Sequence, residues 1–242
     1  MVFVNVGRYI VGRDPWKLDV LYEDNHLLVI NKRAGLATMG VRDPIPSALQ
    51  MARRYVKEKY GKPGEVYLGI VSRLDAPVSG LLVFARTSKS AARLTDQYRT
   101  GRVEKYYWAL VERAVDPEEG ELTNWVRKDE RHRRMHIAGS QTPGAQRALL
   151  TYRTLQVTSQ ATWLEIRLHT GRKHQIRLQL SHAGYPILGD RKYGSRRSFP
   201  EGIGLHGRRL ILQHPVRRTR LELLAPLPSS WRSYGTLPGA GR

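Results

Sequence analysis

A carboxylate in a short loop is the first residue of this sequence whose type and position could do chemistry. Asp75 lies between two apolar segments, 66–71 and 81–86, which we expect to be buried strands, and Arg73 precedes it by two residues. A carboxylate that strands hold in place beside an arginine stays ionised and can act as a nucleophile. An Asp-Ala-Pro sequence is also ordinary turn chemistry, so the position by itself leaves both interpretations open.

A second candidate is the segment 171–177, where hydrogen-bond donors gather as a turn enters a predicted helix over 173–182. Free backbone N–H groups and the helix dipole attract anions at such a start. The spacing places Arg177 one turn beyond Lys173, on the same helix face. The donors are Arg172, Lys173, His174 and Arg177. Spacing alone does not separate an anion-binding site from an ordinary basic helix start.

Two further patterns point away from a cofactor or a metal. The segment 202–207 fits G-x-G-x-x-G, but a strand-like segment follows it and none precedes it, which is the reverse of a dinucleotide-binding motif. His132 and His136 could share a helix face, yet the arginines around them oppose a cation. The chain has no cysteine for a thiolate site. We therefore expect no metal and no cofactor.

The elements that must position these residues are mostly short strands. Apolar and alternating segments, bounded by Gly, Pro and Asp, predict the strands, and capping residues predict the helices. The predicted helices are 47–60, 88–100 and 173–182. The predicted strands are two within 17–31, then 66–71, 81–86, 105–112, 121–127, 147–157, 161–169, 208–214 and 219–224. This order favours an α+β fold with a mixed or antiparallel sheet.

Charge and composition narrow the class of partner. The chain of 242 residues carries a formal net charge of +20, of which residues 1–120 supply +5 and residues 121–242 supply +15. Such an excess favours a polyanion, and arginine suits phosphate, although codon bias also explains a preference for arginine over lysine. No apolar run is long enough for a membrane helix, and the N-terminal segment does not resemble a signal peptide. We expect a soluble, cytoplasmic protein.

The loop around Asp75 carries a family resemblance. Residues 72–82 (SRLDAPVSGLL) closely resemble the H-R-L-D-x-x-T-S-G-L-L motif of the RluA-type RNA pseudouridine synthases. Each other landmark is weak alone, but their order along the chain makes the set specific. The other matching segments are 27–32, 105–111, 171–177, 184–194 and 205–215.

The resemblance implies a fold, a reaction and a set of roles. It implies a mixed, mostly antiparallel central sheet with flanking helices and a central catalytic cleft. The implied reaction converts uridine in structured RNA to pseudouridine without cofactor or metal, with ribosomal RNA the first expectation and transfer RNA the second. Asp75 would be the nucleophile, Tyr107 would pack on the target base and assist proton removal, and Arg177 would pair with Asp75. Arg73 would fill the gap left by the flipped base or hold a phosphate.

The remaining basic residues would hold the RNA. The second half of the chain supplies them, namely Arg172, Lys173, His174, Arg208 and Arg209. Three positions depart from the family pattern: Ser72 replaces the motif His, Val78 replaces the motif Thr, and Arg33 replaces a proline. These departures keep a second hypothesis open, a catalytically inactive RNA-binding or ribosome-assembly protein on the same scaffold.

The expected organisation is a single catalytic domain acting as a monomer. It spans 17–228 with lobes of about 17–115 and 116–228, after an N-terminal extension of 1–16 and before a C-terminal tail of 229–242. The boundary at 113–120 rests on Pro, Gly and acidic residues that occur together there. We expect no membrane contact.

Overall fold

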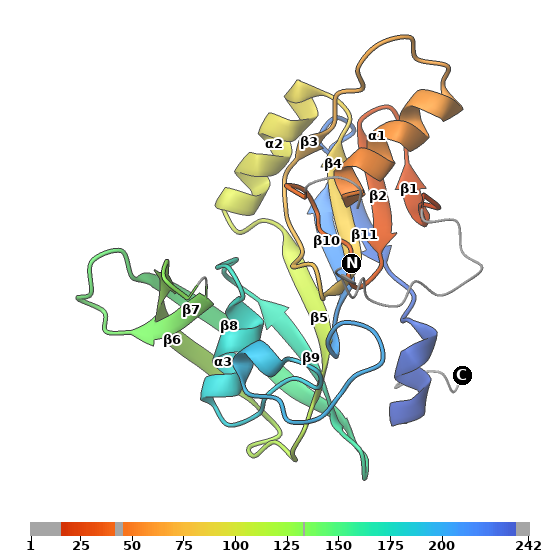
Figure 1. Ribbon diagram of the computed structural model, residues 1–242. Coiled ribbons are helices and arrows are strands. Elements are labelled where there is room, and N and C mark those ends of the chain that lie inside the picture. Colours follow the sequence, from red (N-terminus) through yellow and green to blue (C-terminus); the bar gives the residue numbers. More distant parts are fainter. Residues whose placement is uncertain (1–15, 42–45, 133, 236–242) are drawn as a thin grey trace, which may run out of the picture.

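One bent sheet of eleven strands organises the chain in a computed structural model, which describes residues 16–41, 46–132 and 134–235 (Figure 1). The predicted α+β class is confirmed. In chain order the strands are β1 (Val20–Glu23), β2 (Leu27–Lys32), β3 (Gly69–Ile70), β4 (Ser79–Ala85), β5 (Glu104–Val111), β6 (Glu119–Asp129), β7 (Arg134–Ala138), β8 (Gln146–Val157), β9 (Thr162–Leu168), β10 (Leu205–Gln213) and β11 (Arg220–Leu224).

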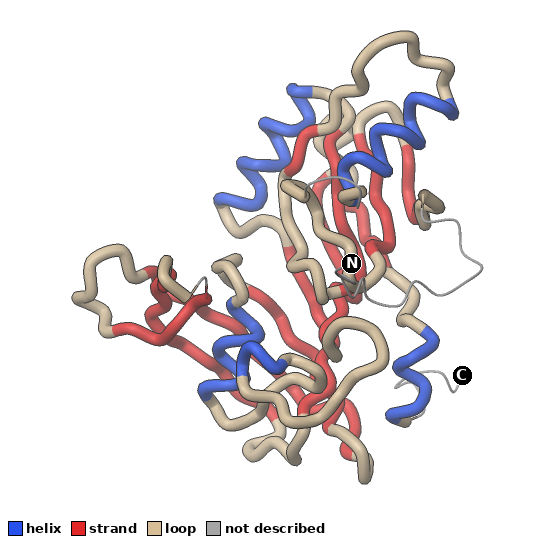
Figure 2. Tube along the Cα trace, in the orientation of Figure 1, coloured by secondary structure: helices blue, strands red, loops and turns tan. Residues whose placement is uncertain are grey.

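Three α-helices lie beside this sheet: α1 (Ala48–Lys59), α2 (Ser88–Arg99) and α3 (Gln175–His182) (Figure 2). The predicted N-terminus of α1 is confirmed. The Ser47 side chain accepts a hydrogen bond from the Gln50 N–H, and the Gln50 side chain accepts one from the Ser47 N–H. α1 and α2 flank the first lobe, and α3 lies against the strands of the second lobe. None of the described helices is long and apolar enough to cross a membrane.

The order of the strands explains how distant segments meet. Along the sheet it runs β1-β2-β4-β10-β5-β9-β8-β6-β7, with β11 beside β10 and β3 beside β4. Every pairing is antiparallel except β4 with β10, where Gly80 lies opposite Gly207. Gly80 has a φ of +115°, and a Cβ there would approach the Gly207 backbone oxygen to 2.3 Å. Only glycine fits this crossing point.

The two lobes are not consecutive in sequence. β10 and β11 come from the expected second lobe, 116–228, but β10 lies between β4 and β5 and pairs with both of these first-lobe strands, and β11 pairs with β10. Pro117, at the expected boundary, begins a second lobe that ends after α3. The chain then returns to complete the first lobe. The sequence does not reveal this return.

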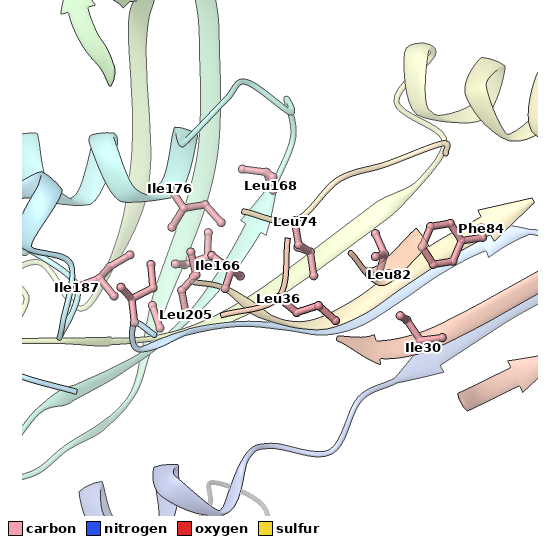
Figure 3. Packing of buried hydrophobic residues seen from close by; sticks show 14 of the residues in the cluster. Ile30, Leu36, Leu74, Leu82, Phe84, Ile166, Leu168, Ile176, Ile187 and Leu205 are labelled. Atoms are coloured by element: carbon pink, nitrogen blue, oxygen red, sulfur yellow. The ribbon is translucent and has the colours of Figure 1, made fainter. Parts of the chain in front are cut away.

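The main apolar core is continuous across both lobes. In Figure 3 it runs from Phe84 and Ile30, through Leu74, to Ile176 and Ile187. Each of these side chains is buried. Leu74 directly precedes Asp75, and Ile176 directly precedes Arg177. Because Leu74 and Ile176 are buried, the adjacent residues Asp75 and Arg177 are held in place where the two lobes meet.

Two details differ from the sequence-based expectation. The segment 134–138, for which the sequence predicts no strand, forms β7, because Met135 packs into an apolar cluster with Leu178 of α3. The expected loose tail is folded up to Gly235: the 3₁₀-helix η2 (Ser229–Tyr234) buries Trp231, which packs against Trp163 and His206. Residues 1–15 and 236–242, parts of the expected extension and tail, lie outside the described residues.

Candidate active site

Main-chain hydrogen bonds hold the loop that carries Asp75 from both sides. The Thr38 hydroxyl donates to the Leu74 carbonyl at 2.9 Å and accepts from the Leu74 N–H at 3.2 Å. On the other side of Asp75, the Ala76 carbonyl accepts from the Gly35 N–H at 2.8 Å. These bonds leave the backbone of Asp75 little freedom, while its side chain stays 27% exposed. The predicted nucleophile is therefore both fixed and accessible.

Arg177, in the first turn of α3, joins two carboxylates. Its Nη1 donates to Asp75 Oδ2 at 2.9 Å, and its Nε and Nη2 donate to the two oxygens of Asp190 at 2.7 and 2.8 Å. Burial alone would lower the pKa of Arg177, but the hydrogen bonds with Asp190 and then Asp75 outweigh it and raise that pKa. Arg177 thus stays charged and holds Asp75 beside a bidentate, buried ion pair.

His174 lies on the other side of Asp75. Its Nε2 is 3.7 Å from Asp75 Oδ2, and its Nδ1 is 2.8 Å from the Tyr193 hydroxyl. Burial lowers the pKa of His174 to about 4, the neighbouring Asp75 carboxylate opposing this and Arg177 reinforcing it. His174 is therefore neutral at pH 7.

Tyr107 forms part of the floor of the cleft that Asp75 also lines. It lies on β5 opposite Gly207, which has no side chain to cover the ring. Burial first, and then the nearby Tyr98 and Asp75, raise the pKa of the Tyr107 hydroxyl. The phenol therefore stays protonated at neutral pH, and its ring is available to a flat ligand.

Lys32 is a buried cation behind the Asp75 loop. Its Nζ donates to the carbonyl oxygens of Leu36 at 2.7 Å, Arg33 at 3.0 Å and Ala76 at 3.2 Å. Burial lowers the pKa of Lys32 to about 7, and the negative charge of Asp75 opposes this shift. Lys32 therefore links the backbone on both sides of the loop and adds positive potential behind the carboxylate.

A cleft of about 1050 Å³ between the lobes gathers most of the predicted site. Six of the predicted residues line it together, namely Arg73, Asp75, Tyr107, Arg172, His174 and Arg177. The cleft also contains cations that the sequence did not single out, Arg99 and Lys105 among them.

Three predicted RNA-binding residues lie outside this cleft. Lys173 is exposed next to it. Arg208 and Arg209 lie with Trp108 and Tyr106, whose side chains project from β5 on the face opposite Tyr107. The Arg209 guanidinium is 3.9 Å from the centre of the Tyr106 ring and pairs with Glu222 at 3.3 Å. Arg208 lies over Trp108 and donates to the Ala225 carbonyl.

The departures from the family pattern leave the backbone of the loop in place. Val78 is 3% exposed within the main core, where an apolar side chain packs without needing a hydrogen-bond partner. Ser72 lies in the cleft beside Tyr98, a residue of α2. Burial, partly offset by a hydrogen bond with Ser72, raises the pKa of Tyr98 to about 12.

Asp190 and Tyr193 are the direct partners of Arg177 and His174 that sequence reasoning missed. Both lie in a segment that matches a family landmark, but a turn aspartate has a sufficient local explanation, and nothing in the spacing shows its pairing with Arg177. A signal exists only when two observations are combined: a buried arginine in an apolar helix requires a carboxylate, and Asp190 is the first acid that follows Arg177 in the sequence.

Comparison with known proteins gives the class of this site. The model of the RNA pseudouridylate synthase family matches residues 26–182. Ribosomal large subunit pseudouridine synthase D of Yersinia pestis is 35% identical over 231 residues, covering 87% of this chain and 67% of that protein. An uncharacterized RNA pseudouridine synthase of Bacillus subtilis, YhcT, is 30% identical, covering 90% of this chain and 71% of that one.

A solved structure agrees. Human RNA pseudouridylate synthase domain containing 4 superimposes with a TM-score of 0.74 at 26% identity, covering 88% of this chain and 92% of that one. The chain therefore belongs to the RNA pseudouridine synthase family, enzymes that isomerise uridine in RNA. It spans about two thirds of the Yersinia relative's length, 67%.

Proposed function

We propose that this enzyme converts uridine in ribosomal RNA to pseudouridine, with Asp75 as the nucleophile. The observation that carries this proposal is the fixed carboxylate beside Arg177 at the centre of a cleft with an aromatic floor. The ribosomal target is supported by relatives named ribosomal large subunit pseudouridine synthases D and C. Transfer RNA is the second candidate.

The residues fit the bonds that must change. The C1′–N1 bond breaks, a C1′–C5 bond forms, the proton on C5 leaves, and N1 gains a proton. A carboxylate can start this by attacking ribose C1′ or base C6, or by removing the C2′ proton, and each route needs Asp75 ionised. Both neighbours of Asp75 approach Oδ2, and no described residue donates a hydrogen bond to Oδ1. Oδ1 is the oxygen available for attack.

Tyr107 supports the base during its rotation. Its ring offers a stacking surface, which contributes about 1–3 kcal/mol per base. Because its hydroxyl stays protonated, Tyr107 can relay the C5 proton only by giving up its own proton in exchange. The same ring can therefore hold the detached uracil and serve the last proton transfer.

A uridine inside folded RNA must first leave its stack, at a cost of a few kcal/mol. Cations around the cleft can offset this by binding the flanking phosphates. Arg73 is exposed at the rim, on the loop that holds Asp75, and Arg172 lies across the cleft from it. This placement supports a role for Arg73 either in the gap left by the base or on a phosphate.

The decisive experiment compares Asp75→Asn with the natural enzyme. Pseudouridine is mapped in total RNA from cells that lack the gene and from cells that express each version, with Asp19→Asn, an exposed aspartate outside the cleft, as the matched control. We expect one or a few ribosomal uridines to be modified by the natural enzyme and the control, and by Asp75→Asn not at all. Modification that survives Asp75→Asn would refute the assignment of the nucleophile.

The same experiment tests the alternative of a non-catalytic RNA-binding protein. That alternative predicts that no uridine depends on the gene, while Asp75→Asn still restores whatever growth or assembly phenotype the deletion causes. Modified sites in transfer RNA alone would replace the ribosomal target and leave the chemistry unchanged.

A further inference from the structure

A series of contacts connects the backbone of β7 to the Asp75 carboxylate through the side chains of Tyr193 and His174. The Met135 backbone N–H of β7 donates to the Tyr193 hydroxyl oxygen at 3.0 Å, and that hydroxyl lies 2.8 Å from His174 Nδ1. The opposite nitrogen, His174 Nε2, lies 3.7 Å from Asp75 Oδ2. Tyr193 and the His174 side chain are only 7% and 10% exposed. Water therefore competes little with these contacts.

The direction of the Tyr193–His174 hydrogen bond sets where the imidazole carries its proton. The Tyr193 oxygen accepts from Met135, and when its own proton is donated to Nδ1, that nitrogen is the acceptor. A neutral imidazole that accepts at Nδ1 carries its proton on Nε2, and burial keeps this ring neutral at pH 7. The N–H that results faces Oδ2, the same oxygen that Arg177 holds at 2.9 Å.

We propose that His174 is a positioning residue for Asp75, set by Tyr193, rather than an RNA-binding cation. This inference rests on the proposed function of Asp75. Arg177 holds Oδ2 through a hydrogen bond, and the His174 ring, 3.7 Å from the same oxygen, limits the rotation of the carboxylate. Without His174, the carboxylate can rotate about χ2 and exchange its two oxygens, so the reactive geometry is populated for less of the time.

The backbone supports a role beyond packing. His174 adopts a left-handed conformation, with φ 52° and ψ 24°, directly before α3, and it makes no capping hydrogen bond from its side chain. Asparagine suits this conformation best among residues with a side chain. Histidine also tolerates this conformation, so a requirement for the backbone alone predicts that asparagine can replace His174 without loss.

Substitution by glutamine or asparagine can distinguish the roles of the two ring nitrogens of His174. Glutamine can place an N–H where Nε2 lies, toward Asp75, and asparagine can place a polar atom where Nδ1 lies, toward Tyr193. We compare His174→Gln, His174→Asn and Tyr193→Phe, which keeps the ring 5.0 Å from the Arg177 guanidinium but removes the hydroxyl. His182→Gln, an exposed histidine at the end of the same helix, is the matched control.

The readouts are kcat and KM for an RNA fragment that the natural enzyme modifies, with folding followed by urea denaturation. We expect kcat to fall about tenfold in His174→Gln and Tyr193→Phe and about a hundredfold in His174→Asn, which corresponds to about 1.4 and 2.7 kcal/mol. KM should change less than threefold in all of them, and His182→Gln should match the natural enzyme. The ¹⁵N spectrum of the natural enzyme should show His174 as the Nε2–H tautomer.

Three outcomes would overturn this proposal. A purely conformational role predicts the reverse order, with His174→Asn more active and more stable than His174→Gln. An RNA-binding role predicts that KM rises while kcat holds. An Nδ1–H tautomer would point the ring's lone pair at Asp75. A natural enzyme that modifies no uridine would instead refute the proposed function, so the two failures are distinguishable.

Discussion

The two walls of the cleft are held by different forces. The wall that carries Asp75 is fixed mainly through backbone carbonyl and N–H groups, which Thr38, Gly35 and Lys32 engage. The wall that carries Arg177 is fixed through ionised side chains, with Asp190 almost completely buried at 2% exposure. The first wall sets where Asp75 lies, and the second sets which way its carboxylate points.

This difference predicts that substitutions in the two walls have different effects. Most hydrogen bonds of the first wall join neutral groups, whereas a buried ion pair becomes costly when one partner is removed. Substitutions in the second wall should therefore cost most in stability.

Arg177→Ala is the most severe test of the second wall. It leaves Asp190 and Asp75 without their shared cation, and removing one partner of a buried pair costs about 3–5 kcal/mol. We expect the free energy of unfolding, measured in urea, to fall by that amount, with no detectable turnover. Arg177→Lys should recover only part of it, because one ammonium cannot reproduce the fork. A loss below about 1 kcal/mol would show that the pair is not buried in solution.

The two walls should also respond to pH in separate windows. His174 has its pKa lowered from 6.5 to about 4, so unfolding takes up a proton between these values and stability falls as pH falls through them. Lys32 has its pKa lowered from 10.5 to about 7, so stability rises as pH rises from 7 toward 10.5.

Each window contributes at most about 1.4 kcal/mol per pH unit. Urea midpoints measured across pH for Lys32→Met should lose the alkaline slope alone, and those for His174→Gln should lose part of the acid slope. A remaining acid slope is expected because burial also lowers the pKa of His206, to about 3. If either substitution flattened both windows, the two walls would not be independent.

Thr38→Val tests the first wall. The substitution keeps the side-chain volume but leaves the N–H and carbonyl of Leu74 without their partner, which costs about 1–3 kcal/mol. We expect kcat to fall about tenfold with little change in KM, since the loop loosens beneath Asp75 while the RNA contacts remain. Thr38→Ser keeps the hydroxyl and should retain most of the activity. Equal loss in both variants would mean that the methyl group, not the hydroxyl, matters.

The smallest effect should separate cations in the cleft from those on the opposite face. Arg172 lines the cleft, whereas Arg209 is engaged with Tyr106 and Glu222. We expect Arg172→Ala to weaken RNA binding several-fold and to reduce the salt slope by about one, and Arg209→Ala to change the slope less. Filter-binding titrations at several salt concentrations measure both slopes. A larger effect of Arg209→Ala would place the RNA on the face opposite the cleft.

Local signals predicted local structure well. Ser47 and Gly61 bound α1 closely, and alternating residues located β9, because capping and side-chain alternation are properties of neighbours in sequence. β7 was missed because its basic residues hide one apolar contact, Met135. Trp231 was assigned to a tail because its partners come from distant segments.

The site residues show the same limit: local motifs located some of them, and contacts between distant segments were not visible in the sequence. Asp75, Tyr107 and Arg177 were located through a recognisable order of motifs, and the structure brings all three to one cleft. Asp190 and Tyr193 act through contacts with α3, and a single sequence contains no measure of such contacts. Arg208 and Arg209 were selected for charge, which does not specify the face of a strand on which a side chain lies.

The parallel pairing of β4 with β10 has a consequence for how the enzyme folds during its synthesis on the ribosome. Gly80, five residues after Asp75, can take its final neighbour only after Gly207 has been synthesised, and the Ile203 N–H that donates to the Pro77 carbonyl is made equally late. Contacts so distant in sequence form slowly, because a long loop must close first. A nascent chain that already contains Asp75, Tyr107 and Arg177 should therefore be inert toward RNA until β10 emerges.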